Sequence, residues 1–350
     1  MGSAMRVRSV SVFLLALAAA TAGAQNSIIV AGTAGDVLGQ VKVFDGLTHT
    51  ELSSFIPFSG FTGGVRVAAG DVNGDGTPDI VTGAGAGSGA GGPHVKVFDG
   101  RTYGVIHDFF AFDPSFVGGV NVATGDVNGD GLADLVVGSG VGAAHVKVFD
   151  GLTGTELRSF LPYSASYAGG VRVASGDLDG DGRADLVVGT ETGSSHVKAF
   201  DGQTLSTTAS FFAYDPSFTG GVNVGTLDFD GDGDLDLLTG AATDSPHVKA
   251  LGLDGSSLAS FFAFSSGGVS VAGLMPDGRT PHLVVGSQTD SLLRIYDPLL
   301  NTVGSFDPFG LGRTVGVNVA AAFSPVPEPA SLAALGLGIA AVVRRRLRPR

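Results

Sequence analysis

A short acidic motif with the pattern Asp-x-Asn/Asp-x-Asp-Gly-x-x-Asp occurs four times in the chain. The first copy, DVNGDGTPD, runs from Asp71 to Asp79, and the later copies begin at Asp126, Asp177 and Asp228. Each copy crowds carboxylate and amide oxygens into nine positions, where like charges repel one another unless a cation lies among them. Side-chain oxygens from positions 1, 3, 5 and 9, with a main-chain carbonyl from position 7, form the hard oxygen shell that Ca²⁺ prefers.

The motif therefore predicts one calcium ion per copy, about four in all. A glycine at position 6 allows each loop to turn tightly around the ion. The expected ligands, including the residue that supplies the carbonyl at position 7, are Asp71, Asn73, Asp75, Thr77 and Asp79; Asp126, Asn128, Asp130, Leu132 and Asp134; Asp177, Asp179, Asp181, Arg183 and Asp185; and Asp228, Asp230, Asp232, Asp234 and Asp236.

Two other interpretations compete with the calcium loop. An EF-hand needs a bidentate Glu at position 12, and here that position is Thr82, Val137, Val188 or Thr239. Turns without metal are the second alternative, because Asp and Asn favour turns in any case. Four near-identical copies favour calcium over such turns. A degenerate fifth copy keeps only Asp277, so we predict no ion there.

The acidic motif belongs to a longer repeat, which predicts the fold. GGVRVAAGDVNGDGTPDIVTG, from Gly63, recurs in related form from Gly118, Gly169, Gly220 and Gly267, at a period of 47 to 55 residues. Each unit also contains a block similar to HVKVFDG and an aromatic block similar to SFFAF. Because Gly, Asp and Ser separate these short apolar runs, we expect four strands per unit. Four short strands at this period are typical of a β-propeller blade.

The two ends of the repeated region predict how the ring closes. Residues 27–58 supply second, third and fourth strands without a first one, and GVNVAAAF, from Gly316, is a first strand with nothing after it. Joined, these segments complete one blade and leave no open sheet edge. We therefore predict an all-β fold, a six-bladed β-propeller of four-stranded blades whose first blade is closed by the N- and C-terminal strands.

The combination of blade repeat and acidic loop resembles the FG-GAP/VCBS repeats, the calcium-loop propeller blades also found in integrin α-subunits. The resemblance covers about Ser27 to Phe323. It implies that the ions lie on one rim of the propeller and serve its architecture. It also implies that ligands meet the opposite rim.

Both ends of the chain resemble targeting segments. Residues 1–24 contain a short basic stretch, an apolar run and small residues before Gln25, which predicts a secretory signal peptide. A buried N-terminal helix is the alternative. We expect three segments: the signal peptide at 1–24, the propeller at 25–323 and a sorting signal at 324–350.

The last 25 residues contain Val-Pro-Glu-Pro from Val326, a short apolar run and a cluster of arginines. This layout resembles the PEP-CTERM sorting signal of Gram-negative bacteria. The resemblance implies transient anchoring in the inner membrane and removal of the tail by an exosortase, commonly beside exopolysaccharide production. A simple tail anchor is the alternative.

Charge and composition exclude several classes of partner and chemistry. The net charge is −13 for the chain and −19 between Gln25 and Pro325, because seven of the basic residues lie in the two end segments. A field of this sign repels nucleic acid and attracts cations. The chain has no cysteine, and it contains neither His-Glu-x-x-His nor Gly-x-Ser-x-Gly. A cysteine nucleophile, disulfides and these two catalytic motifs are therefore excluded.

Four histidines occupy one equivalent place in four repeats, where the loop between the second and third strands enters the third strand. They are His94, His145, His196 and His247. We expect them on the rim opposite the calcium loops, where they are candidates for binding a metal or an anionic sugar. Duplication copies a residue whether or not it has a role, so a structural role is the competing interpretation.

A second equivalent series lies on the expected innermost strand, where Arg66, Asn121, Arg172 and Asn223 alternate. The sequence leaves open whether these side chains face the central channel or its packing.

Three functional classes remain. The favoured one is an exported, non-enzymatic, calcium-stabilised propeller that binds an extracellular polysaccharide or a surface protein at the cell surface or in the surrounding matrix. The second is a polysaccharide lyase or hydrolase, which two titratable groups within hydrogen-bonding reach in a deep pocket would favour. The third is a purely structural envelope protein, which a rim without pockets would favour.

Overall fold

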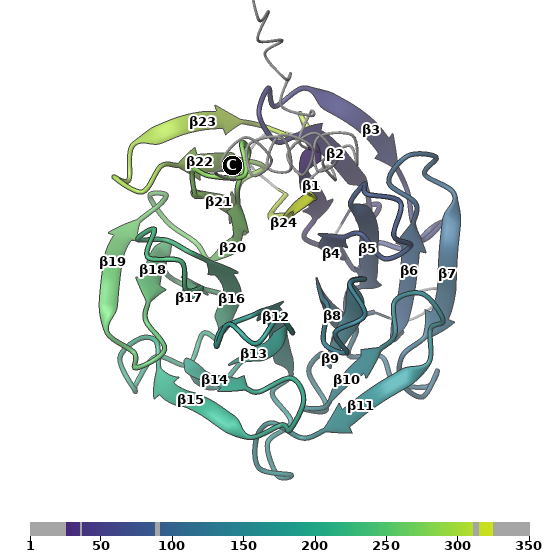
Figure 1. Cartoon of the computed structure of the whole chain (residues 1–350), viewed down its shortest axis with the longest axis horizontal. Helices are drawn as coiled ribbons and strands as arrows, with labels where there is room; N and C mark the ends of the chain where they lie inside the picture. The colour runs from purple at the N-terminus through teal and green to yellow at the C-terminus, as the bar shows by residue number, and fades with distance from the viewer. Residues whose placement is uncertain (1–25, 36, 88–91, 311–314, 325–350) are drawn as a thin grey trace, which may run out of the picture. The chain divides into compact units, whose positions relative to one another are not determined.

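The computed structural model describes residues 26–35, 37–87, 92–310 and 315–324 (Figure 1). In these ranges the chain forms 24 strands, arranged as six antiparallel four-stranded sheets around a ring. None of the described segments is a helix long and apolar enough to cross a membrane. The expected signal peptide and sorting signal lie outside the described residues. The predicted six-bladed β-propeller is confirmed.

The strands fall into four concentric positions. The innermost strands are β4 (Val65–Gly70), β8 (Val120–Gly125), β12 (Val171–Gly176), β16 (Val222–Leu227), β20 (Val269–Leu274) and β24 (Val317–Ser324). The second strands are β1 (Asn26–Thr33), β5 (Asp79–Ala84), β9 (Asp134–Ser139), β13 (Asp185–Thr190), β17 (Asp236–Ala241) and β21 (His282–Ser287). The third strands are β2 (Val41–Asp45), β6 (His94–Phe98), β10 (Val146–Phe149), β14 (His196–Phe200), β18 (His247–Leu251) and β22 (Leu293–Tyr296). The outermost strands are β3 (Glu51–Phe55), β7 (Val105–Phe110), β11 (Glu156–Phe160), β15 (Thr207–Phe212), β19 (Ser257–Phe262) and β23 (Thr302–Phe306).

We number the blades in chain order. Blade 1 combines β24 with β1, β2 and β3, and blades 2 to 6 are β4–β7, β8–β11, β12–β15, β16–β19 and β20–β23. In blade 1 the last strand of the propeller pairs antiparallel with the first, with Ile29 opposite Ala321 (Figure 1). This pairing confirms that the N- and C-terminal strands close the ring.

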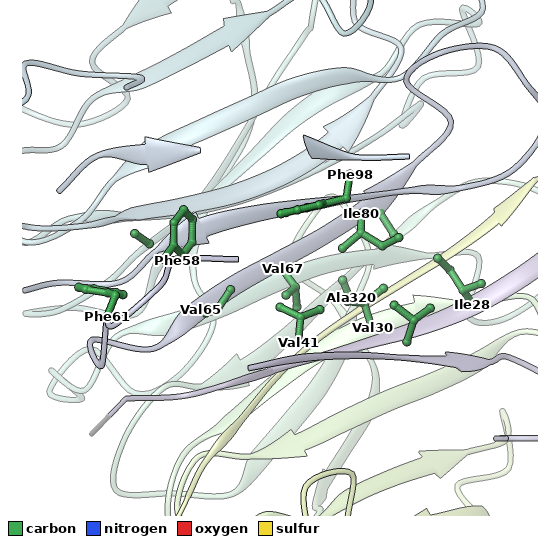
Figure 2. Close-up of a cluster of buried hydrophobic side chains, with 13 residues drawn as sticks. Ile28, Val30, Val41, Phe58, Phe61, Val65, Val67, Ile80, Phe98 and Ala320 are labelled. Atoms are coloured by element: carbon green, nitrogen blue, oxygen red, sulfur yellow. The ribbon is translucent and has the colours of Figure 1, made fainter. Parts of the chain in front are cut away.

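The hydrophobic core lies between the blades. The second strand of a blade is covered on both faces by neighbouring blades, so all six side-chain positions of β5 are buried, whereas β7 on the outside alternates between exposed and half-buried. Figure 2 shows the cluster between blades 1 and 2, where Val30 and Val41 of blade 1 pack against Val65 and Ile80 of blade 2. Each fully buried aliphatic side chain of this kind contributes about 1.5–3 kcal/mol.

A glycine near the end of the second strand lets the next blade approach closely. A Cβ at Gly189 would lie 2.6 Å from the carbonyl oxygen of Val222, and one at Gly138 would lie 2.7 Å from that of Val171. Any larger residue would therefore push the neighbouring innermost strand away. This contact explains why the repeat places Gly after the apolar run of its second strand.

The polar series on the innermost strands joins neighbouring blades. The Nδ2 of Asn121 donates to the carbonyl of Val171 at 2.8 Å, and the Nδ2 of Asn223 donates to that of Val269 at 2.7 Å. Asn318 makes the same bond to Val65 across the closed blade, at 2.9 Å. The asparagines of this series therefore belong to the packing between blades.

Candidate functional site

The acidic loops lie where the innermost strand of a blade turns into the second strand. Because the blades are repeated antiparallel sheets, blades 2 to 5 place these loops at the same end of the ring. The chain reverses direction at every turn of an antiparallel blade. The turn between the third and outermost strands therefore lies at the same end as the acidic loop. Two separate segments of each blade therefore meet at this rim.

Within a loop, the first Asp organises the backbone around its carboxylate. In blade 2 the Oδ1 of Asp71 accepts hydrogen bonds from the N–H groups of Gly74 and Asp75, at 2.8 and 3.1 Å, and its Oδ2 accepts one from Gly76 at 2.8 Å. Gly74 and Gly76 have φ angles of 77° and 81°, which other residues rarely adopt. These hydrogen bonds therefore hold the loop in a compact turn without an ion.

The Asp at position 9 opens the second strand, and it is buried in blades 2 to 4 and half-buried in blade 5. In blade 3, Asp134 accepts hydrogen bonds from the N–H groups of Val127, Asn128 and Gly151, at 2.9, 3.0 and 3.1 Å. Burial raises the pKa of Asp134 to about 6, although these three N–H groups favour the charged form. The pKa values of Asp79 and Asp236 are raised to about 6 by the same cause. Position 9 thus links the loop to the turn before the outermost strand.

The two loops made only of aspartates bring their carboxylates together. In blade 4, Asp177, Asp179 and Asp181 each offer an oxygen within 4.8 Å of the others. In blade 5, Asp228, Asp230 and Asp236 form a similar group. Three carboxylates at this separation match the hard oxygen shell of Ca²⁺. These two loops therefore fit the cation that the sequence predicts.

In blade 5 the backbone N–H of Asp232 donates to the Oδ1 of Asp230 at 3.2 Å. Asp232 accepts a hydrogen bond from the N–H of Asp234 through its Oδ1, at 2.9 Å. Asp234 occupies position 7 of its loop. The sequence predicts that the main-chain carbonyl at this position binds the ion, and the equivalent residues in the other loops are Thr77, Leu132 and Arg183. The side chain of Arg183 reaches the preceding blade, where it donates to the carbonyl of Asn128.

The two loops that contain Asn place an amide nitrogen among the carboxylates. The Nδ2 of Asn128 donates to Asp130, Asp134 and Asp150, at 3.0, 3.3 and 3.2 Å. A calcium ligand at this position must present its oxygen instead, so an ion requires rotation of the amide. Blade 3 therefore holds a hydrogen-bonded cluster where blade 4 has only carboxylates.

Blade 2 has a similar arrangement with an added cation of its own. The Nδ2 of Asn73 donates to Asp99 at 3.0 Å, and the Nε of Arg101 lies 3.2 Å from an Oδ2 of Asp75. Because this guanidinium neutralises part of the cluster, it would compete with an ion for Asp75.

One ligand set was missed by reasoning from the motif alone. Asp201, in the turn after β14, joins Asp179 and Asp185 with its oxygen within 4.8 Å of theirs. The Oδ1 of Asp201 also caps the turn by accepting from the N–H of Thr204 at 2.5 Å. Asp99 and Asp150 have the equivalent place in blades 2 and 3. The signal was present in the sequence, because an Asp follows the third strand in the HVKVFDG block of these repeats.

The fifth copy of the motif differs as its sequence suggests. Asp277 accepts hydrogen bonds from the N–H groups of Arg279 and Thr280, at 2.9 and 2.6 Å, and so caps a tight turn. The segment supplies a single carboxylate.

The four candidate histidines lie at the opposite rim, each half-buried beside aromatic rings. The ring of His196 lies 5.4 Å from that of Tyr163 in the preceding blade and 4.9 Å from that of Phe212 in its own. Burial lowers the pKa of His196, and the Lys198 ammonium lowers it further. The same two causes lower the pKa values of His145 and His247.

Each histidine also has a polar partner on the adjacent outermost strand. The Nε2 atoms of His145, His196 and His247 lie 2.8 to 2.9 Å from the hydroxyls of Ser159, Ser210 and Ser260. Among the residues that the structure describes, no group of three metal-binding side chains includes a histidine. These contacts give the histidines a structural role in joining neighbouring blades.

One pair at this rim meets part of the criterion for an enzyme. The Nε2 of His94 lies 2.5 Å from the Oδ1 of Asp108, and Lys96 contacts the other oxygen of the same carboxylate at 3.0 Å. The pair occupies the place of the His–Ser pairs in other blades, and it lines none of the four cavities described below.

The central channel contains a small cluster of charges. Glu191 lies 3.1 Å from a guanidinium nitrogen of Arg172 and 3.9 Å from one of Arg66. The Oδ1 of Asn121 accepts from the Nε of Arg66 at 3.1 Å. Burial lowers the pKa of Arg66 to about 10, with the nearby Arg172 adding to the effect. The arginines of the alternating series thus face the channel, while the asparagines join the blades.

Cavities lie along the central channel and between blades 5 and 6. Two, of about 160 and 60 Å³, lie along the central channel and are lined by the innermost strands of all six blades. A third, of about 450 Å³, lies at the acidic-loop end of that channel, beside Asp71, Asp126 and Asp228. The fourth, of about 340 Å³, lies on blade 6 beside Phe264 and Arg294.

Comparisons with known proteins agree with this geometry. The FG-GAP-like repeat matches residues 126–188 and 177–239, and the FG-GAP repeat matches residues 63–100. The PEP-CTERM protein-sorting motif matches residues 325–347. A solved structure of a protein of unknown function from Bacteroides caccae is similar, with 12% sequence identity and a TM-score of 0.52 over 84% of this chain and 98% of that one. At this identity the similarity shows the fold alone.

The matched repeats coincide with blades 2 to 5, where the acidic loops lie. The matched tail indicates export and membrane-associated sorting in Gram-negative bacteria, and it implies processing by exosortase-type machinery. The chain is therefore an FG-GAP-repeat β-propeller protein with a PEP-CTERM sorting motif at its C-terminal end.

Proposed function

We propose that this protein is an exported, calcium-stabilised binding module that acts without catalysis at the cell surface or in the exopolysaccharide matrix. The observation that carries the proposal is the grouping of three carboxylates within 4.8 Å of one another in the acidic loops of blades 4 and 5. Calcium outside the cell is abundant enough to occupy such sites, and the sorting motif directs the chain to that side.

Calcium would supply cross-links that the chain does not obtain from disulfides. The propeller has no disulfide, because the chain contains no cysteine. In about 1 mM calcium, a site with a Kd of about 0.1 mM contributes about 1.4 kcal/mol to the free energy of unfolding. Bound cations would also neutralise part of the −19 charge between Gln25 and Pro325. Both effects support an architectural role for the ions.

Packing at the opposite rim supports binding in preference to catalysis. Three of the candidate histidines have serine partners and aromatic neighbours that hold the rings between blades. A general base must reach a substrate proton, and these rings are engaged in joining the blades. We therefore propose a partner outside the cell, an extracellular polysaccharide or a surface protein, with polysaccharide favoured by the cavity described in the next section.

Thermal unfolding of the purified protein tests the calcium proposal. We expect 1 mM CaCl₂ to raise the midpoint by roughly 10 °C over protein treated with EGTA, since several sites contribute together. The same concentration of MgCl₂ serves as the control, because Mg²⁺ demands a smaller octahedral shell and should stabilise much less. An unchanged midpoint with calcium would reject the proposal.

A glycan array tests the binding role directly. The purified protein, labelled on lysine and applied with and without Ca²⁺, should retain a defined set of extracellular glycans when calcium is present. Incubation of candidate glycans with the protein, followed by analysis of their chain length, separates binding from cleavage. Shortened glycan chains would show that the protein is an enzyme and would reject the non-catalytic binding role.

A further inference from the structure

An aromatic slot recurs between neighbouring blades at the rim opposite the acidic loops. The first aromatic residue after the outermost strand of one blade packs on the histidine that begins the third strand of the next. The ring centroids of Tyr214 and His247 are 5.2 Å apart, and those of His247 and Phe262 are 4.7 Å apart. The histidine ring thus fills the space between an inner and an outer aromatic ring.

Blade 6 lacks the histidine. Leu292 holds its place, because the carbonyl of Leu292 accepts from the N–H of Ser287 as the carbonyl of His145 accepts from the N–H of Ser139. A leucine side chain is not planar and makes no hydrogen bond to the outermost strand.

The slot of blade 6 keeps its inner ring, Phe264, but lacks the outer ring and the second ring that packs on the inner one. Its third strand pairs so that Phe306 lies opposite Leu293, which places Asp307 where Phe262 and Phe212 stand in blades 5 and 4. The connection after Phe264 is three residues shorter than the one after Tyr214 and has no counterpart to Phe218. Elsewhere that second ring packs on the first, at 5.5 Å for Tyr214 and Phe218.

These three departures from the repeat converge on one place and leave a cavity of about 340 Å³. Its lining includes Phe264, Asp290, Leu292, Arg294 and Asp307. The other three cavities that we describe lie along the central channel or at its end. A volume of this size falls within the range of ligand pockets.

The polar groups of the cavity are held in place before any ligand arrives. The Nη1 of Arg294 donates to the carbonyl of Ala263 at 2.6 Å, and its guanidinium lies 4.9 Å from the ring centre of Phe264. The Oδ1 of Asp307 accepts from the N–H groups of Phe309 and Gly310, at 3.0 and 2.8 Å. Fixed groups of this kind lower the entropy cost of binding.

We propose that this cavity binds one sugar residue of a neutral polysaccharide. Sugar hydroxyls both donate and accept, which matches a lining that combines two carboxylates with a guanidinium and two serine hydroxyls. Asp290 and Asp307 outnumber Arg294, so the cavity carries a net negative charge and repels uronic acids and sulfated sugars. This inference rests on the proposed binding function and places the binding site at the cavity of blade 6.

The test compares neutral and acidic polymers by affinity gel electrophoresis of the purified protein in calcium. Dextran, pullulan and galactomannan are the neutral probes, and alginate and polygalacturonate are the acidic ones. We expect at least one neutral polymer to retard the protein and neither acidic polymer to do so. Retardation by the acidic polymers, or by none of the five, overturns the inference.

A variant that restores the repeat separates the cavity from the rest of the surface. Leu292→His combined with Asp307→Phe introduces the side chains that fill this slot in blades 4 and 5, so the fold should tolerate them. We expect at least a tenfold loss of affinity for the retained polymer with an unchanged unfolding midpoint. Leu161→Phe, which adds a phenyl beside His145 in blade 3, is the matched control and should bind normally.

The outcomes distinguish the two proposals. If the double variant binds as tightly as the parent protein, the cavity is not the site, while the binding function itself stands. If no polysaccharide on the array or in the gels binds the parent protein, both fail. If Leu161→Phe loses binding as strongly as the double variant, the effect is not specific to blade 6, and the assignment is wrong.

Discussion

Asp134 and the other acids at position 9 differ physically from the acids that precede them in the loop. The carboxylate of Asp134 is fully buried and accepts three backbone hydrogen bonds, whereas that of Asp130 is exposed and accepts from one backbone N–H and one amide. Buried N–H groups without an acceptor cost about 1–3 kcal/mol each. Position 9 therefore stabilises the loop with or without an ion.

This difference predicts separate effects of two substitutions. Asp134→Ala should lower the free energy of unfolding by at least about 2 kcal/mol even in EGTA, because it leaves buried N–H groups unpaired. Asp130→Ala should cost little in EGTA and should remove one calcium ion in its presence. Urea unfolding and metal analysis of the dialysed protein measure both. An unchanged calcium content in Asp130→Ala would contradict the assignment of that loop.

The histidines at the opposite rim predict a dependence on pH. Since the pKa values of His145, His196 and His247 are lowered in the folded chain, the unfolded chain takes up protons at a higher pH than the folded one. The contribution of these histidines to the free energy of unfolding must then fall as the pH drops below about 6.5. Blade 1 offers a natural replacement, because the amide of Gln40 donates to the hydroxyl of Ser54 at 2.8 Å.

Replacing all three histidines by Gln should therefore weaken this dependence. The unfolding midpoint of the parent protein should drop between pH 7.5 and pH 5.5 in saturating calcium, and that of the variant should drop less. Comparison at equal calcium removes the contribution that both proteins share. Equal losses in the two proteins would show that these imidazoles do not titrate on unfolding.

At the scale of elements, the four acidic loops form two kinds. The loops of blades 4 and 5 contain only aspartates, while those of blades 2 and 3 carry Asn73 and Asn128 with their amide nitrogens turned toward the carboxylates. Affinity for calcium rises with the number of ligand charges. Blades 4 and 5 should therefore bind calcium more tightly than blades 2 and 3.

Isothermal titration calorimetry of the calcium-free protein checks this order. We expect two classes of site, with the tighter class lost when Asp179 and Asp230 are replaced by Asn. The reverse substitution, Asn128→Asp, should convert one weak site into a tight one, because it replaces the central amide with a carboxylate. A single class of four equal sites would show that the amides rotate without measurable cost.

At the scale of the whole molecule, blade 1 holds the ring closed. β24 pairs with β1 along eight residues, and Asn318 reaches the carbonyl of Val65 in blade 2. Without β24, the edge of β1 and the core between blades 6 and 1 would be exposed. Unpaired edges of this kind promote association with other chains.

Truncation tests this closure. A chain that ends at Gly310 should lose most of its stability and form dimers or aggregates, whereas one that ends at Pro325 retains β24 and should remain monomeric. Light scattering coupled to gel filtration measures the mass, and thermal unfolding measures the stability. A stable monomer that ends at Gly310 would mean that blades 2 to 6 and an incomplete blade 1 suffice.

Repetition made much of this protein predictable. Strand positions, blade number and closure follow from recurring sequence blocks, because each repeat independently predicts the same four strands. The acidic loops were also found from spacing, because positions 1, 3, 5 and 9 lie within one turn. Asp201 was missed because it follows the third strand, and only the meeting of two turns at one rim brings it beside Asp179.

The sequence by itself determined the four-stranded unit, the number of units and the segment that completes the ring, because all of these are written as local patterns or as matching incomplete ends. Only the tertiary structure decided which way Asn128 turns, what surrounds the histidines and where the departures of blade 6 meet. Leu292, Asp307 and the short connection after Phe264 lie far apart along the chain, and they become one cavity only because neighbouring blades pack against each other.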